Sequence, residues 1–396
     1  MNLVSHQHLS VGVETSCKYP LRFELWKMRL CRAFGVDSLF IPDHLSTVSP
    51  EAGWNRDATP AVAQAAPAEA AFLEPFVMLG TMAARIGRVR LGTGVTDPLR
   101  RHPATLAQAF VTLDHLTRGR AILGIGSGDR ENIEPYGIDF HRRLERLEEA
   151  LRVIRMLWDS HGRPVDFEGA FWRLRRARFE LPLHRGRPPT IWVAAHGPVA
   201  LAIAGRHGGG WYPTIRMTAA EYREKLGIIV RAGVAAGRTM DEFEAAAQVF
   251  VMPGPSRKEV LDAALRTPAV GGLLLSVPPR IWERHGVRHP LEGRYRGFGT
   301  TLARDVIVND LNEASARATT DLIGDVVFAG SPGEIVEEIA PLVGAGMKHV
   351  VLANFGPMVR GFRIDDLLRF AILIRRLRRL PTVSSSAAIA ARYPPA

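Results

Sequence analysis

The stretch HLTRGRAILGIGSGDRENIEPYG, residues 115–137, decides the fold of this chain. Its apolar run, Ala121–Ile125, is followed directly by Gly126, Ser127 and Gly128. The run predicts a buried strand, so glycines and polar groups stand at the carboxyl end of that strand. Ligands bind at this end in parallel α/β proteins. The segment therefore predicts both a parallel sheet and a functional site at its edge.

A dinucleotide-binding fold is the main alternative reading of this segment. Gly124 and Gly126 match the first two glycines of the G-x-G-x-x-G pattern, but Asp129 stands at the third position. The pattern also requires a helix directly after the glycines, and the sequence EPYG at 134–137 would interrupt one. A second alternative is an ordinary strand end without a functional role.

Apolar strand segments alternate with amphipathic helical segments along the rest of the chain. We expect eight strands, at 9–14, 38–41, 89–95, 121–125, 191–195, 210–213, 247–252 and 349–352. Helical periodicity follows several of them, as at 144–158, where Leu, Ile and Trp recur every three or four residues. This alternation predicts an α/β protein with a closed (β/α)8 TIM barrel.

The chain is longer than a minimal barrel, which takes about 250 residues. We assign the surplus to insertions in a single domain, 1–380. The insertions are expected near 44–75, 160–190 and 267–320. Residues 381–396, PTVSSSAAIAARYPPA, are small, polar and rich in proline, which predicts a disordered tail.

Composition narrows the class of protein. The 396 residues are 46% hydrophobic and 23% charged, which is typical of globular enzymes. The net charge of +11 comes mostly from scattered arginines without an aromatic and basic stripe, so we expect no nucleic-acid partner. Arg375, Arg376, Arg378 and Arg379 form a basic cluster, which leaves open a peripheral membrane contact.

Targeting and metal signals are absent from the sequence. Cys17 and Cys31 lack ligand spacing and favour a reducing compartment. The first residues have neither a basic leader nor an apolar core, and no apolar run reaches the length of a membrane span. We therefore expect a cytoplasmic protein. His285 and His289 are four residues apart, but a glycine and a proline beside them argue against a helical metal site, so no metal is expected.

Four segments of the sequence occur in a fixed order near the ends of expected strands. They are GVDSLFIPDHL at 35–45, the segment from RLGTGV to IEPYG at 90–137, IWVAAHGP at 191–198 and VVFAGSPGEIVEEI at 326–339. Together they resemble the bacterial luciferase-like (LLM class) superfamily, and within it the branch that uses the deazaflavin coenzyme F420. The resemblance covers about residues 9–380 and implies a luciferase-like TIM barrel with oxidoreductase activity.

Asp43 and His44 follow the second expected strand, at the edge where a barrel carries its active site. A histidine there can orient or protonate a carbonyl oxygen, although an isolated Asp-His pair is often only a hydrogen-bonded turn. The resemblance implies that Asp43 contacts the deazaflavin and that His44 lies beside its reactive carbon. Asp129 stands where the family usually has a glutamate that donates a proton. Aspartate is shorter by one methylene, so either His44 or Asp129 can be the proton donor.

The remaining candidate residues are expected to bind the coenzyme. The resemblance implies a bulge with a non-prolyl cis peptide at Gly94 and Val95, where a strand-end turn is the alternative. Ser127, Gly128 and Asn132 supply a hydroxyl, free amides and a side-chain amide around the coenzyme.

A second coenzyme contact is expected after the strand at 191–195. Gly197, Pro198 and Val199 follow this strand and open a helix. Unpaired backbone N–H groups at the start of a helix attract phosphate, so we expect the phosphodiester of the coenzyme to bind here. A plain helix start is the alternative.

The resulting functional hypothesis is an F420-dependent ketoreductase that transfers hydride to the ketone of a lipid-like substrate. We expect residues 267–320 to cover a long apolar ketone, and the resemblance implies a homodimer. Two alternatives stay open. One is a luciferase-like monooxygenase that uses FMN, and the other is a non-catalytic barrel that binds a lipid or an anion.

Overall fold

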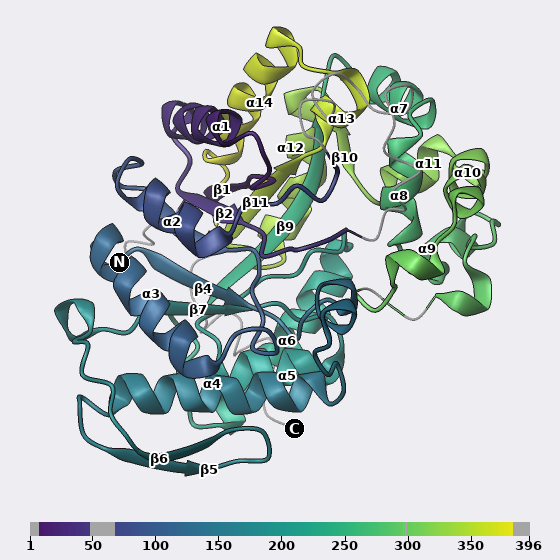
Figure 1. The fold of residues 1–396 in the computed structure, drawn as a ribbon. Helices are drawn as coiled ribbons and strands as arrows, with labels where there is room; N and C mark the ends of the chain where they lie inside the picture. The colour runs from purple at the N-terminus through teal and green to yellow at the C-terminus, as the bar shows by residue number, and fades with distance from the viewer. Residues whose placement is uncertain (1–7, 48–67, 296, 298, 383–396) are drawn as a thin grey trace.

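The computed structural model describes residues 8–47, 68–295, 297 and 299–382 (Figure 1). Within them, eight parallel strands form a barrel: β1 Ser10–Glu14, β2 Ser38–Ile41, β3 Arg90–Thr93, β4 Ala121–Ile125, β7 Thr190–Val193, β8 Gly210–Trp211, β9 Glu244–Pro253 and β11 His349–Asn354. Strand β1 pairs with β11, and β8 pairs with β9, which closes the ring. The expected (β/α)8 barrel is confirmed, and the open dinucleotide-binding sheet is wrong.

Helices surround the barrel, as Figure 1 shows. They are α1 Leu21–Phe34, α2 Pro75–Ala83, α3 Pro103–Thr117, α4 Arg143–Asp159, α5 Pro198–His207, α6 Ala219–Ala235, α12 Pro332–Gly344 and α14 Ile364–Leu377. Strand side chains alternate between the interior and this outer layer. On β4, Ile122 packs inside with Phe40 and Trp192, whereas Leu123 and Ile125 belong to the core shared with the helices. Burial on both faces explains the continuous apolar run of β4.

Three further strands were not expected, and the first two form a separate sheet. Strands β5 Val165–Glu168 and β6 Arg173–Ala177 form an antiparallel hairpin within the insertion expected at 160–190. Strand β10 Phe328–Gly330 pairs with the last residues of β9 outside the ring of eight. All three strands are short, and β6 carries charged residues in place of an apolar run, so periodicity gives no signal for the hairpin.

The insertion expected at 267–320 is mainly helical. It includes α8 Ala269–Leu275, α9 Pro279–Arg284 and α10 Val308–Arg317, between α7 Arg257–Leu265 and α11 Thr320–Gly324. Leu274, Trp282 and Leu291 are buried in a second hydrophobic cluster, which the insertion shares with α7 and with the ends of β9 and β10. His289 is buried there and binds backbone groups, with its Nδ1 accepting from Leu291 N–H and its Nε2 3.1 Å from the Val277 carbonyl. His289 therefore has a packing role.

Several predictions concern the ends of the chain and its first insertion. Pro381, the first residue of the expected disordered tail, forms a β-bridge with His8, and 383–396 lie outside the described residues. Of the insertion expected at 44–75, residues 48–67 also lie outside them. The assignment of 1–380 to one domain stays a prediction. None of the described helices combines the length and the hydrophobicity needed to cross a membrane.

Candidate active site

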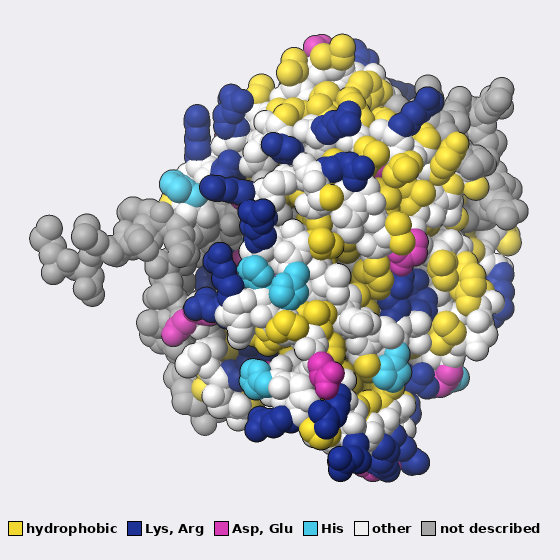
Figure 2. Space-filling view, turned by 60° about the vertical axis from the view of Figure 1, so that its left-hand side comes forward, with side chains coloured by type: hydrophobic (Ala, Val, Ile, Leu, Met, Phe, Trp, Pro, Cys, Tyr) yellow, Lys and Arg dark blue, Asp and Glu magenta, His cyan; other side chains and the backbone are white. Residues whose placement is uncertain are grey.

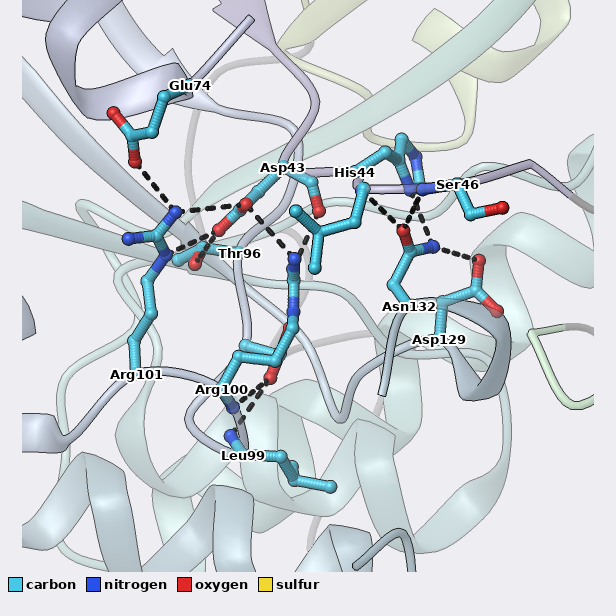
Figure 3. Close-up of polar contacts among 12 residues, drawn as sticks. Asp43, His44, Ser46, Glu74, Thr96, Leu99, Arg100, Arg101, Asp129 and Asn132 are labelled. Carbon is cyan, nitrogen blue, oxygen red and sulfur yellow. Dashed lines mark hydrogen bonds and ion pairs between the residues drawn. The ribbon is translucent and has the colours of Figure 1, made fainter. Parts of the chain in front are cut away.

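The polar residues expected at the carboxyl ends of the strands lie at one end of the barrel, because the strands are parallel and neighbours. Asp43 and His44 follow β2, and the loop with Asp129 and Asn132 follows β4 (Figure 3). Side chains from the two loops interact directly, although a strand separates β2 from β4 in the sheet.

Asp43 is fixed by two arginines that follow β3. Its carboxylate is 3% exposed and accepts hydrogen bonds from the Thr96 hydroxyl at 2.6 Å and from Arg101 Nε at 2.8 Å. Arg100 Nη2 donates to the Asp43 carbonyl at 2.6 Å. Burial by itself would raise the pKa of the Asp43 carboxyl, but the hydrogen bonds and charges of Arg101 and Arg100 outweigh it and lower the pKa. Asp43 is therefore an anchored anion, and its expected contact with the coenzyme stays a prediction.

Asn132 connects the loops after β2 and β4. Its Oδ1 accepts hydrogen bonds from the backbone N–H groups of Leu45, at 2.6 Å, and Ser46, at 2.9 Å. Its Nδ2 lies 3.0 Å from His44 Nδ1 and donates to Asp129 Oδ2 at 3.1 Å. Asn132 is 1% exposed, so all these groups are held in place by one buried amide. Both expected catalytic residues, His44 and Asp129, therefore contact the side-chain amide of Asn132.

This arrangement determines the tautomer of His44. The two backbone donors fix the oxygen side of the Asn132 amide, so the nitrogen faces His44 and must donate to its Nδ1. The proton of a neutral His44 ring therefore sits on Nε2. Burial lowers the pKa of His44, although the charge of Asp129 acts in the opposite direction. At neutral pH His44 is a neutral ring with one N–H to donate.

The glycine and serine positions after β4 have structural explanations of their own. Gly128 has φ of +85°, which favours glycine, and the loop returns there toward Ile133. Ser127 Oγ accepts a hydrogen bond from Arg143 Nη1 at 3.1 Å. Arg143 is a functional candidate that sequence reasoning missed, because only the fold brings α4 to this loop.

The peptide between Gly94 and Val95 is cis, as the resemblance implied. A side chain at Gly94 has no space, since a Cβ atom there would lie 2.4 Å from Glu14 Oε2 and 2.8 Å from the Tyr212 hydroxyl. Gly94 therefore allows the chain to pass directly over a polar group at the end of β1.

That polar group, Glu14, is the main site residue that sequence reasoning missed. Its Oε2 accepts from the Tyr212 hydroxyl and its Oε1 from Gln248 Nε2, both at 2.8 Å. Burial raises the pKa of Glu14 to about 8, despite these two donors. The carboxyl is thus protonated at neutral pH. A carboxylic acid at the last residue of a buried barrel strand was the available signal.

The raised pKa of Glu14 makes a prediction about stability. A carboxyl that is protonated in the folded state, with a pKa of about 8 against 4.5 in the unfolded chain, stabilises the fold fully below pH 4.5. That contribution is lost as the pH rises to about 8. We expect the free energy of unfolding to fall over this window, and Glu14→Gln to flatten the fall. Urea titrations at pH 5 and 8.5 measure this. Glu180→Gln, at an exposed carboxylate, is the control and should keep the wild-type slope.

The residues expected to hold a phosphate lie on the neighbouring loop, after β7. Gly197 is the N-cap of α5, has no side-chain cap and is followed by Pro198 at the first helical position. A Cβ atom at Gly197 would meet nothing within 4 Å, and Val199 is 58% exposed. The helix start is therefore open to a ligand. Within the described residues, no hydrogen bond joins Gly197, Pro198 or Val199 to the His44 and Asp129 group.

The insertion is attached to this site. Ala303 N–H donates to Glu131 Oε2 at 2.7 Å, and the Ser46 hydroxyl donates to Glu131 Oε1 at 3.1 Å. Arg130 N–H donates to the Gly299 carbonyl at 2.9 Å. Glu131 is 7% exposed and thus connects three loops: those after β2 and β4, and the insertion.

Comparison with known proteins agrees with this architecture. A family model described as luciferase-like monooxygenase matches residues 34–349. The chain belongs to the luciferase-like monooxygenase family. A protein of Mycobacterium sp. (strain JLS), named phthiodiolone/phenolphthiodiolone dimycocerosates ketoreductase, is 38% identical over 354 residues, which cover 87% of this chain and 91% of that protein. The chain is therefore an enzyme of the oxidoreductase class.

Solved structures confirm the luciferase-like barrel. An F420-dependent secondary alcohol dehydrogenase, in complex with an F420-acetone adduct, aligns with a TM-score of 0.73 and 20% identity over 94% of this chain and 99% of that chain. The oxygenating constituent of a diketocamphane monooxygenase from Pseudomonas putida, in complex with FMN, aligns with a TM-score of 0.64 and 17% identity over 96% and 100% of the two chains. At these identities the likeness concerns the fold.

Proposed function

We propose that this luciferase-like enzyme is an F420-dependent ketoreductase that reduces the ketone of a lipid-like substrate to an alcohol. The observation that carries the proposal is the neutral His44 ring, whose Nδ1 is occupied by Asn132 and whose Nε2 keeps its proton. Such a ring can hydrogen-bond to a carbonyl oxygen and stabilise the negative charge that develops there. The 38% identical relative that is named a ketoreductase supports the same chemistry.

The residues present fit a reduced deazaflavin with a phosphodiester. Gly94 places no side chain over the end of the barrel, and the uncapped backbone N–H groups at the start of α5 can donate hydrogen bonds to an anion. Ser127 and Gly128 are proposed to line the same space, whereas Asn132 is buried and is proposed to act through its contact with His44. When bound, the coenzyme supplies the hydride that goes to the ketone carbon.

The chain's own residues supply the proton and the alignment. His44 Nε2–H orients the ketone through its oxygen, and the oxygen takes up a proton as the alcohol forms. Glu14 is proposed as the source of this proton, because its raised pKa keeps it protonated at neutral pH. Asp129, held by the same amide as His44, is the alternative donor.

The substrate class is proposed from the insertion. Its attachment through Glu131 and Ala303 holds it beside the loop that bears Asp129. A small cavity of about 20 Å³ at its junction with the barrel has a mainly apolar lining, with Phe250, Leu273 and Ile281 among its residues. An apolar lining on an insertion that contacts the loop with Asp129 suits a hydrophobic substrate and the exclusion of water.

Titration with each coenzyme tests the proposal. We expect the wild type to bind reduced F420 at least about tenfold more tightly than FMN. Gly197→Asp should weaken F420 binding by at least about tenfold, because a carboxylate would face the phosphate, whereas it should not lower stability, since aspartate is a favourable N-cap. Gly197→Ala is the matched control and should bind normally, because its Cβ has space.

Calorimetry measures the affinities. Wild-type affinity in Gly197→Asp would place the phosphate elsewhere. Preference for FMN, together with oxygen consumption, would instead support the FMN-dependent monooxygenase, which the FMN-bound structural neighbour makes the second candidate.

A further inference from the structure

Helix α14 carries an exposed apolar stripe. Ile364, Leu368 and Ile372 are 71%, 56% and 41% exposed, and their spacing of four residues places them on one face of the helix. The opposite face of α14 is buried in the main core, where Phe370 and Leu373 lie. The exposed stripe therefore does not pack in the core, and folding of the barrel does not explain why these positions are hydrophobic.

Helix α1 extends this apolar surface. Phe362, just before α14, is 45% exposed, and its ring lies 5.4 Å from the ring of Trp26 on α1. Phe23 also stacks on Trp26, with a centroid distance of 5.4 Å. We call the surface formed by Trp26, Phe362 and the α14 stripe the α1/α14 face. Figure 2 shows hydrophobic side chains gathered over the upper part of the molecule, the height at which α1 and α14 lie in Figure 1.

The α1/α14 face begins at the catalytic end of the barrel. Helix α1 follows β1 and α14 follows β11, so the first residues of both helices lie near the carboxyl ends of these strands. Phe362 and Ile364 are therefore on the same end of the barrel as Glu14 and His44.

Cationic side chains surround the face. Residues 363–379 contain six arginines and two aspartates, and α1 contains three arginines, one lysine and one glutamate. One aspartate, Asp366, is already paired with Arg360 and Arg369. Of these nine arginines only Arg369 and Arg378 form an ion pair with a described carboxylate. The other seven are Arg22, Arg29, Arg32, Arg363, Arg375, Arg376 and Arg379. By helical spacing, Arg375 continues the face that Ile364 and Leu368 begin, and Arg379 follows just after the end of α14.

We propose that the α1/α14 face binds the surface of an anionic lipid bilayer. An apolar stripe flanked by arginines fits the boundary between headgroups and acyl chains, where the hydrophobic side chains insert and the guanidinium groups contact lipid phosphates. A second copy of this chain fits less well, because a two-fold interface through this face would bring the unpaired arginines of both copies together. The proposal concerns binding alone and does not depend on the coenzyme or the ketone.

Vesicle co-sedimentation tests it with the full chain and no coenzyme. The probes are vesicles of phosphatidylcholine alone and vesicles with 30 mol% phosphatidylglycerol, in about 0.1 M salt. We expect binding to the anionic vesicles only. The double variants Ile364→Ser/Leu368→Ser and Arg375→Glu/Arg379→Glu should each weaken it by at least about tenfold. Matched controls at exposed sites on other elements, Val234→Ser and Arg185→Glu/Arg187→Glu, should bind like the wild type.

Three results would overturn the proposal. The first is no binding to anionic vesicles, and the second is an equal loss in the control variants. The third is a change of molar mass by light scattering in the Ile364→Ser/Leu368→Ser variant while vesicle binding persists, which would make the face an interface between copies. Ketone reduction that fails while vesicle binding persists would reject the proposed function and leave this inference standing.

Discussion

Ketone reduction by the His44→Ala variant is expected to be about 100-fold to 10,000-fold slower than by the wild type, the range that loss of a positioned proton or hydrogen-bond donor gives. The reason is that Nε2–H of His44 is the donor that the Asn132 contact leaves free for a carbonyl oxygen. Coenzyme affinity should change by less than about tenfold. Single-turnover stopped-flow measurements at saturating reduced coenzyme isolate the hydride step.

A second substitution at the same position sharpens this test. His44→Gln keeps an amide N–H at a similar reach, so it should recover part of the rate that alanine loses. Equal rates for wild type and His44→Ala in a single turnover would remove His44 from the mechanism. A loss of coenzyme affinity as large as the loss of rate would make His44 a binding residue instead.

Asn132→Leu is expected to have the second largest effect, because it acts on stability and on rate. The backbone N–H groups of Leu45 and Ser46 would lose their acceptor, which costs about 2–4 kcal/mol for two buried donors. The rate of ketone reduction should fall at least about 100-fold, since His44 and Asp129 lose their common partner. Denaturant titration and stopped-flow kinetics measure the two losses.

Asn132→Asp separates these two roles. Aspartate still accepts from Leu45 and Ser46, so the loss of stability should be smaller than for leucine. It cannot donate to His44 Nδ1, and a carboxylate there favours a proton on that nitrogen and raises the pKa of His44. The rate should then fall as the pH rises through the His44 pKa, because Nε2 loses its proton. A pH profile parallel to that of the wild type would show that Asn132 does not set the tautomer.

The sequence by itself determined the barrel. Apolar runs such as Ala121–Ile125 are buried on both faces, and the helix periodicity at 144–158 matches the buried side of α4. The residues that follow strands, such as Asp43 and His44, were also assigned correctly to one end of the barrel. The apolar runs of buried strands and the periodicity of helices are local patterns, so a short segment of sequence is enough to recognise them.

Only the tertiary structure decided how these residues are connected. The contact between Asn132 and His44 joins residues 88 positions apart, and those of Glu14 with Tyr212 and Gln248 span 198 and 234 positions. The tautomer of His44 and the protonation of Glu14 follow from these contacts and from burial, and no local pattern encodes either. Hydrogen-bond partners and desolvation depend on which strands become neighbours when the barrel closes, and therefore on the whole chain.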